Sequence, residues 1–321
     1  MKFTSIPANG SSWREPLVYR FSVDGDVPED AQVEIIDSSS GSVLGTVKLY
    51  GIIKGEIDIA PYVAKSVSLT PVWSTRPLAI VRSPSAKRVI VSVNGMTSLD
   101  RLFFRSQFDA SAACALSSVA DNQLVEHGDV VRLTLYSLGS TVVKMSYGKE
   151  TMTQMQTSMQ AGGYPMELFF ATDRMGVGDS VELQVTTDNS LVQTFSFKVV
   201  ERGAASRALI WYNPNGGIER HVFSHCFKLG YSVDVQGVNG VNSLKLRSVN
   251  GRVRSRLCSG YESGAEAERV AQILLSPVVF LDKKDSAEVV ELESRSVEFD
   301  SKGQLHSLTF DISEEWKGGV L

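Results

Sequence analysis

The stretch Leu209–Phe223, LIWYNPNGGIERHVF, decides the architecture of the last third of the chain. An apolar and aromatic run enters the turn sequence Asn-Pro-Asn-Gly-Gly at 213–217, and the second run IERHVF follows it. Pro214 fixes φ, and the two glycines supply the positive φ values that a tight reversal needs. The stretch therefore predicts a β-hairpin that opens a C-terminal β domain.

Alternation of apolar and polar residues with period two extends from this hairpin through most of the chain. In the first third it predicts strands at 16–23, 31–36, 43–50, 55–59 and 88–93. In the middle third it predicts strands at 130–138, 141–147, 166–172, 180–187 and 191–200. In the last third it predicts strands at 278–281, 288–294 and 306–312. The spacing, roughly 8–12 residues in the middle third, is typical of antiparallel sandwiches.

The expected fold class is mainly all-β, with two to three linked antiparallel β-sandwich-like domains. A chain of 321 residues is too long for one ordinary sandwich and suits units of roughly 100 residues. We expect an N-terminal β domain at 1–104, a middle β-sandwich domain at 105–203 and a C-terminal β domain at 204–321. The short polar segment 201–206 is the predicted linker before the last domain.

One helix is predicted, in the C-terminal domain at about 264–275. Ser263 and Glu266 stand at the spacing of a capping box. Apolar residues then recur at helical intervals until Pro277, which ends the run.

Composition excludes several classes of protein. The hydrophobic fraction of 43% and the charged fraction of 21% allow packed cores, and the net charge of −4 gives no general attraction to nucleic acid or anionic membrane. The three cysteines, 114, 226 and 258, lie far apart in the sequence and are odd in number, which fits neither a disulfide framework nor the paired spacing of a zinc site. No apolar run has the length of a signal peptide core at the N-terminus or of a membrane span elsewhere. We expect the protein to be made and kept in a cytosol, or to leave it only as part of a particle.

The sequence LKLRSV-Asn250-Gly251-RVRSRL, 244–257, carries the strongest concentration of positive charge. A two-residue turn at Asn250-Gly251 would fold it into a hairpin with its cations on one face. These cations are Lys245, Arg247, Arg252, Arg254 and Arg256. The face is either a docking surface for an acidic partner, phosphate or anionic polysaccharide, or it is compensated internally by the acidic strand Glu288, Glu291, Glu293 or simply solvated. No aromatic residue interleaves with the cations, which argues against single-stranded nucleic acid.

Methionines form a second candidate interaction surface. Six of the eight lie between 145 and 175, and the segment 149–163 fits neither strand nor helix periodicity. It predicts a long adaptable loop that offers Met152, Met155 and Met159 to a partner. Alternatively, the loop packs its methionines on its own domain.

Chemistry-bearing motifs are scarce. His221 and His225 would lie about 13 Å apart on a strand, too far for one zinc ion, with Cys226 on the other face. The acidic segment 24–30 has turn composition but lacks the pattern of a calcium loop. The sequence contains no GxSxG, HExxH, Walker or dinucleotide-binding motif. We therefore expect no catalytic residues, no metal and no cofactor.

Three groups of segments carry a family resemblance. GSVLGTVKLYG and GEIDIAPYV within 41–63, the hairpin 209–223, and AERVAQILLSPVVFL with QLHSLTFDI, at 267–281 and 304–312, are similar to a class of β-rich virion proteins. These proteins belong to phages and prophages of gut Bacteroidales. The resemblance covers the first and third units and implies a structural role around the tail or its connector, in the virion, with no catalytic residue.

The first functional hypothesis is therefore a non-enzymatic virion structural protein that assembles with copies of itself or with other virion proteins. The first alternative is a carbohydrate-binding or adhesion module, which would present tryptophan or tyrosine on one sheet face; the tryptophans are scattered at 13, 73, 211 and 316. The second alternative is an enzyme that acts on polysaccharide through a pair of carboxylates in a cleft.

Overall fold

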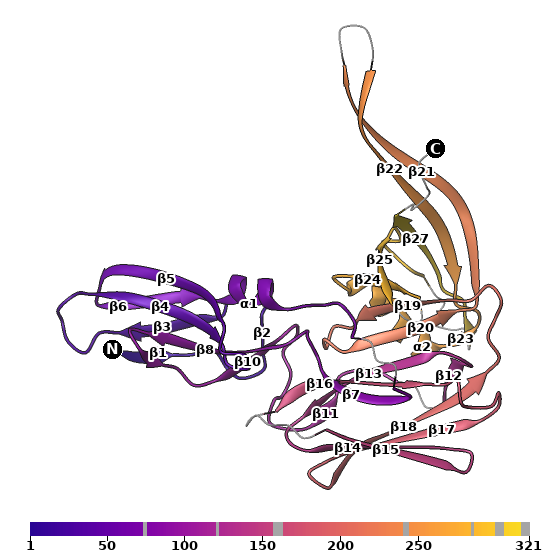
Figure 1. Cartoon of the computed structure of the whole chain (residues 1–321), viewed down its shortest axis with the longest axis horizontal. Coiled ribbons are helices and arrows are strands. Elements are labelled where there is room, and N and C mark those ends of the chain that lie inside the picture. The colour runs from indigo at the N-terminus through magenta and orange to yellow at the C-terminus, as the bar shows by residue number, and fades with distance from the viewer. Residues whose placement is uncertain are drawn as a thin grey trace.

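The computed structural model describes residues 1–72, 76–119, 122–156, 163–239, 244–283, 286–298 and 305–315. The described chain is mainly β and forms several sheets, in which almost all strand pairs are antiparallel; this confirms the expected fold class. Figure 1 shows the first unit lying to one side of the other two, which are stacked on each other. A two-stranded ribbon projects from the third unit (Figure 1).

The first unit is a sandwich of two sheets. The smaller sheet has the order β1 (Lys2–Ser5), β3 (Val18–Ser22), β6 (Lys54–Asp58). The larger has the order β2 (Ser11–Ser12), β10 (Arg101–Phe104), β8 (Lys87–Val93), β4 (Glu29–Asp37), β5 (Val43–Ile52), with β9 (Met96–Thr97) paired to β8. Apolar residues at alternate positions of β3, β4 and β8 meet between the sheets, so the period-two pattern builds this core.

A short helix in this unit, α1 (Ala60–Ser66), was not predicted. Asp58 accepts hydrogen bonds from the backbone N–H of Ala60, 2.9 Å away, and of Leu17, 2.8 Å away. Pro61 lies in the first turn, where its missing N–H costs nothing. Seven residues are too few for helical periodicity to be recognised in the sequence.

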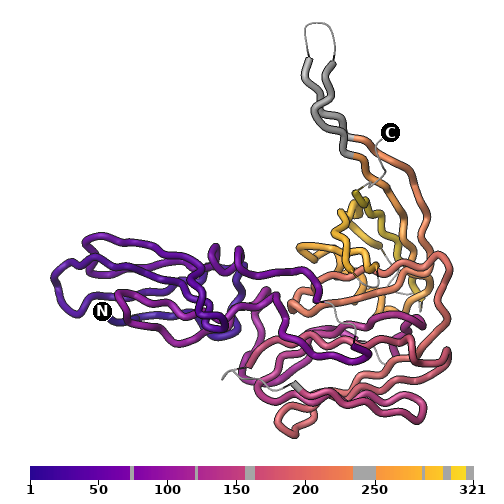
Figure 2. Tube along the Cα trace, viewed as in Figure 1, coloured from indigo at the N-terminus to yellow at the C-terminus, as the bar shows by residue number. Residues whose placement is uncertain are grey.

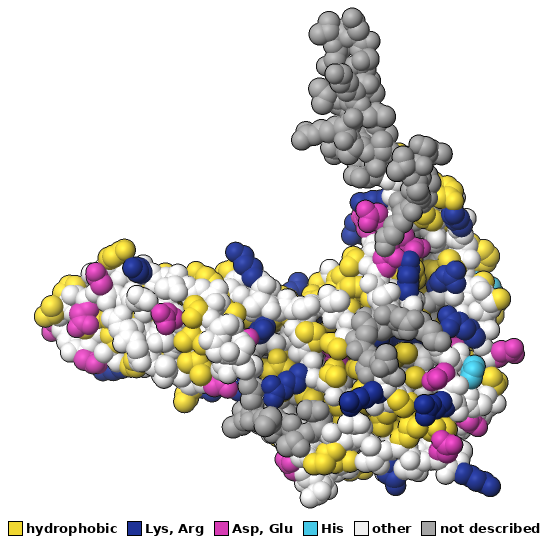
Figure 3. Space-filling view, in the orientation of Figure 1, with side chains coloured by type: hydrophobic (Ala, Val, Ile, Leu, Met, Phe, Trp, Pro, Cys, Tyr) yellow, Lys and Arg dark blue, Asp and Glu magenta, His cyan; other side chains and the backbone are white. Residues whose placement is uncertain are grey.

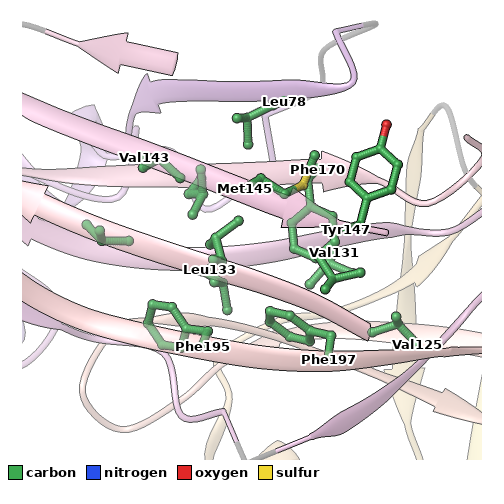
Figure 4. Packing of buried hydrophobic residues seen from close by; sticks show 14 of the residues in the cluster. Leu78, Val125, Val131, Leu133, Val143, Met145, Tyr147, Phe170, Phe195 and Phe197 are labelled. Atoms are coloured by element: carbon green, nitrogen blue, oxygen red, sulfur yellow. The ribbon is translucent and has the colours of Figure 1, made fainter. Parts of the chain in front are cut away.

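The middle unit is also a sandwich. One sheet has the order β11 (Cys114–Ala115), β13 (Val130–Ser137), β16 (Tyr164–Ala171), β7 (Leu78–Arg82). The other has the order β12 (Gln123–Glu126), β18 (Ser190–Val200), β17 (Ser180–Thr187), β14 (Thr141–Tyr147), β15 (Glu150–Gln156). Figure 4 shows side chains of both sheets meeting in the core, among them Leu133, Val143 and Phe197. β7 lies within the predicted first unit, 1–104, yet it pairs with β16 here.

The third unit contains a seven-stranded sheet and the predicted helix. The sheet order is β20 (Ile218–Phe223), β19 (Arg207–Tyr212), β24 (Val279–Asp282), β25 (Ala287–Leu292), β27 (Thr309–Glu315), β22 (Leu244–Cys258), β21 (His225–Asn239). A two-stranded sheet joins β23 (Glu262–Ser263) to β26 (Leu305–His306). The helix α2 (Gly264–Ala271) is capped by Ser263, as predicted, and continues into η1 (Gln272–Leu275). Its apolar residues pack on the sheet.

The predicted hairpin at 209–223 is confirmed, since β19 and β20 pair from Arg207–Phe223 to Tyr212–Ile218 around the turn. The predicted turn at Asn250-Gly251 is wrong. β22 runs through these residues as one strand, and Asn250 and Gly251 pair with Asp234 and Val233 of β21. A local turn signal was overruled here by pairing with a strand that precedes it in the chain.

Candidate functional site: the projecting ribbon and the junction pocket

Three arginines of β22 lie on one exposed face of the third unit, each beside a carboxylate. Arg254 Nε donates to Glu293 Oε2 at 2.7 Å, and Arg256 Nε donates to Asp311 Oδ1 at 2.7 Å. Arg252 Nη1 donates to Glu291 Oε2. We call these three ion pairs the arginine ladder. Figure 3 shows basic and acidic side chains intermingled on this part of the molecule.

The ladder corresponds to the internally compensated alternative for the cationic face. Glu291 and Glu293 belong to the acidic strand that the sequence suggests as the source of compensation. The third acid, Asp311 of β27, is not part of that prediction. The hydrogen bond from Arg256 holds the pKa of Asp311 below its ordinary value. The side chains of Lys245 and Arg247 lie outside the described part of the chain. Of the five predicted cations, the structure therefore describes the side chains of Arg252, Arg254 and Arg256.

β21 and β22 extend beyond the sheet that carries them. Among the described residues, β27 pairs with β22 over Arg252–Cys258 and not beyond. From Val233–Gly251 onward to Asn239–Leu244, the described strands β21 and β22 pair with each other alone. We call this stretch, 233–239 with 244–251, the projecting ribbon; it is visible at the top of Figure 1, and Figure 2 shows the path of the two strands at its base. A two-stranded ribbon has marginal stability by itself, because it has no sheet face to bury.

β21 is the edge strand of the seven-stranded sheet, and it exposes an unusual amount of apolar surface. Phe227, Leu229, Tyr231 and Val233 are between 44% and 58% exposed. A bulge near Lys228 and Gly230 shifts the register, so Phe227 shares the face of Arg256, whereas Tyr231 is opposite Val253 on the other face. We call these four residues the β21 edge. Exposed apolar edge strands are normally avoided, since they invite pairing with another chain.

The predicted methionine loop is partly a strand. Residues 150–156 form β15, which pairs with β14 along its whole length, so the loop prediction is wrong for this stretch. Met152 packs against the core of the middle unit, whereas Met155 is 56% exposed at the sheet edge. Met159 lies outside the described residues. Met145, Met166 and Met175 are buried in the same core, which agrees with the alternative that the methionines pack on their own domain.

The hairpin 209–223 also forms the junction between the middle and third units. Asn213 Nδ2 donates to the carbonyl oxygen of Leu116 at 2.8 Å, and the backbone N–H of Ile218 donates to Thr134 Oγ1 at 2.9 Å. The Ser117 hydroxyl donates to the carbonyl oxygen of Ile218. The turn at 213–217 therefore packs against the middle unit.

A network of buried charges continues from this turn. Arg220 pairs with Asp129 of the middle unit at 2.9 Å and with Asp282 at 2.8 Å, and the three side chains are nearly inaccessible to solvent. Arg269 of α2 pairs with Glu219 at 2.8 Å. Its Nε also donates to Glu266 Oε2 at 2.8 Å. Buried charges require such pairing, because an isolated one would be very costly.

The network shifts the pKa values of its members in opposite directions. Burial raises the pKa of Glu219, although Arg269 opposes the change. Burial alone would also raise the pKa of Glu266, but hydrogen bonds from Arg269 and His221 outweigh it and the net pKa is lowered. Since both carboxylates bind Arg269, their geometry is that of a structural ion-pair network rather than of a free acid–base pair.

A cavity of about 480 Å³ lies beside this network, at the junction of the two units. Its walls include Val125 and Leu133 of the middle unit and Glu219, His221 and Glu262 of the third. His221 Nδ1 lies 3.2 Å from Glu266 Oε1, and its Nε2 lies 3.4 Å from Glu262 Oε1. Tyr261, which is 81% exposed, also borders the cavity. We call this site the junction pocket.

The two histidines and the cysteine predicted as ordinary sheet positions do not converge. His221 is buried in the junction pocket, whereas the ring of His225 stacks on Phe227 with centroids 6.2 Å apart. Within the described residues, no group of three or more His, Cys, Asp or Glu side chains could hold a metal ion. Trp211 is fully buried and Trp13 half-buried, while Trp73 and Trp316 lie outside the described residues.

Sequence reasoning missed the most buried functional groups of the junction. Alternation in IERHVF places Arg220 on the face of Ile218 and Val222, but it does not predict burial of the guanidinium, since charged residues are rarely buried. A possible signal was the concentration of Glu219, Arg220 and His221 directly after a glycine turn. Nothing in the sequence identified Arg269 as their partner, because it lies on a helix fifty residues away.

Comparison with known proteins gives no family. No family model matches the chain, and no curated protein matches it. One similar solved structure is described as "Crystal structure of Dpr2 Ig1-Ig2 in complex with DIP-Theta Ig1-Ig3". The match has 13% sequence identity, covers 62% of this chain and 98% of that chain, and has a TM-score of 0.21. No helix in the described residues has the length and apolar character needed to span a bilayer. With a likeness this distant, function has to be argued from the chain's own surfaces.

Proposed function

We propose that the chain is a non-enzymatic structural protein of a phage or prophage virion, associated with the tail or its connector. It would act through assembly contacts with copies of itself and with neighbouring virion proteins. The resemblance at 41–63, 209–223 and 267–281 motivates the choice of particle. The projecting ribbon, with the β21 edge at its base, is the observation that carries the assembly role.

The physical argument concerns unpaired backbone. The outer side of β21 presents N–H and C=O groups that pair with no described strand, and four large apolar side chains stand beside them. A strand added by another copy would pair these groups and cover the apolar side chains. The arginine ladder does not compete for this role, because its cations are paired within the unit.

The test is the oligomeric state of variants that block the edge. Leu229→Lys with Tyr231→Lys places two charges on the β21 edge, which should prevent strand addition. Leu191→Lys on β18, also at an exposed leucine, is the matched control. Light scattering coupled to size exclusion should show self-association of the wild type and of the control, and a monomer for the double variant.

A wild type that stays monomeric at high concentration, and that also forms no complex when co-expressed with its neighbouring gene products, would overturn the proposal. Neighbouring genes for portal, tape-measure or tail proteins would support the choice of particle. The melting temperature of the double variant should match that of the wild-type monomer, which separates a lost contact from a lost fold.

A further inference from the structure

The junction pocket is acidic on balance. Its charged wall residues are five glutamates and three arginines: Glu126, Glu201, Glu219, Glu262, Glu266, Arg132, Arg220 and Arg269. Arg220 is already compensated by Asp129 and Asp282, and these two carboxylates lie outside the pocket wall. The pocket therefore favours a positively charged occupant.

His221 supplies the second, independent observation. The side chain is 8% exposed, and its Nδ1 faces the Glu266 carboxylate, which can only accept a hydrogen bond. The proton of a neutral ring therefore belongs on Nδ1, which leaves Nε2 as an acceptor. Nε2 makes no hydrogen bond with any described residue, although the Glu262 carboxylate lies 3.4 Å away. With a neutral ring, two acceptors therefore face each other at the pocket wall, His221 Nε2 and the Glu262 carboxylate.

We propose that the junction pocket binds a primary alkylammonium group, which donates hydrogen bonds to His221 Nε2 and to the Glu262 carboxylate. An ammonium carries three donors and no acceptor, so it satisfies both atoms at once. The apolar wall formed by Val125, Val131 and Leu133 receives the alkyl chain. Tyr261 at the border adds an aromatic ring to the pocket lining, a group that attracts cations. This inference is independent of the proposed role in assembly.

The ammonium has two possible sources, a small free amine or a lysine side chain of another protein. Isothermal titration with n-pentylamine tests the first, and titration with Nα-acetyl-lysine-N-methylamide tests the second. Binding of n-pentylamine alone would indicate that the pocket takes small free amines. Binding of both compounds would indicate that it accepts a lysine side chain. 1-Pentanol, which has the same chain without the charge, should bind at least tenfold more weakly.

Glu262→Gln removes the charge and keeps the shape of the side chain. It should weaken pentylamine about tenfold, the size expected for one charge-assisted hydrogen bond. Glu268→Gln, at an exposed position of α2 outside the pocket, is the matched control and should bind as the wild type does. Equal affinity of wild type and Glu262→Gln, or no binding of either amine, would overturn the proposal.

The imidazole resonances of the wild-type protein, measured by NMR, test the proposal without any substitution. Pentylamine should shift the Nε2 resonance of His221 and leave that of the exposed His225 unchanged, while pentanol should shift neither. A His221 ring that is already protonated on both nitrogens at the pH of the titration would make Nε2 a donor to Glu262. That result would also overturn the proposal, since no acceptor would remain for the amine.

Discussion

Gly217 lies so close to Leu116 that a Cβ on Gly217 would stand well under 3.0 Å from the carbonyl oxygen of Leu116. The same carbonyl oxygen accepts a hydrogen bond from Asn213 Nδ2, and the N–H of Gly217 donates to Asn213 Oδ1 at 2.8 Å. Backbone meets backbone here across two units, which only glycine permits.

Gly217→Ala should therefore destabilise the protein by about 1–3 kcal/mol, the usual range for overpacking a rigid contact. Gly203→Ala is the control, because a Cβ there would meet its nearest neighbour, Ser206 Cβ, at an ordinary 3.5 Å. Chemical denaturation of both variants checks the expectation. Equal stability of the two alanine variants would show that the junction yields to an added methyl group.

Arg220→Met should cost more, about 3–5 kcal/mol, because it removes the cation that neutralises the buried carboxylates of Asp129 and Asp282. Arg256→Met breaks an exposed ion pair of the arginine ladder and should leave the denaturation midpoint almost unchanged. The comparison uses the same substitution in both places. A similar loss of unfolding free energy in the two variants would mean that burial does not determine how much each ion pair contributes to stability.

Glu266 should make stability depend on acid pH. Its pKa in the folded protein is below the ordinary value of 4.5, so its contribution is complete above that pH and is lost as the pH falls toward the lowered value. The difference in unfolding free energy between wild type and Glu266→Gln should be largest near pH 7 and shrink below about pH 4. Urea denaturation across this range measures it, with Glu268→Gln as the exposed control. A difference that does not change with pH would exclude the ionised carboxylate as its source.

The arginine ladder allows a charge-exchange experiment. Arg254→Glu places a carboxylate beside Glu293 and should lower the melting temperature slightly, without unfolding the chain. Adding Glu293→Arg reverses the pair and should restore the melting temperature. A double-mutant cycle from thermal melts gives the coupling. Failure of the second change to compensate would indicate that Arg254 has another partner, for example in an assembled particle.

Local chemistry explains which elements could be predicted from the sequence. The hairpin 209–223 carries its turn in five consecutive residues, and the helix at 264–271 carries its cap at Ser263. In both cases the residues that produce the signal are neighbours in the sequence, so no distant contact is needed to recognise it. Asn250-Gly251 has an equally strong local signal, but the two residues pair with Asp234 and Val233 of β21, and this pairing holds them extended.

The junction could not be predicted for a different reason. Arg220 and Arg269 are charged residues that become buried because carboxylates neutralise them. Asp129 and Asp282 pair with Arg220, while Glu219 and Glu266, the latter from the same helix, pair with Arg269. A period-two pattern assigns each residue to a face, and it contains no information on which distant side chain will meet it. The same limit applies to Arg105, which donates to the carbonyl oxygens of Tyr212 and Leu275 at 2.8 Å.

The path of β7 has a consequence for how the chain folds during synthesis. Leu78 pairs with Phe170, so β7 leaves the ribosome well before its partner strand β16 exists. The strands β8 and β10, which follow β7, can complete the first sandwich while β7 is still unpaired. At ordinary rates of elongation this wait lasts several seconds. A fragment that ends at residue 104 would lack β16, so β7 would stay unpaired and expose Leu78 and Ile80. A fragment made for expression should therefore include the middle unit.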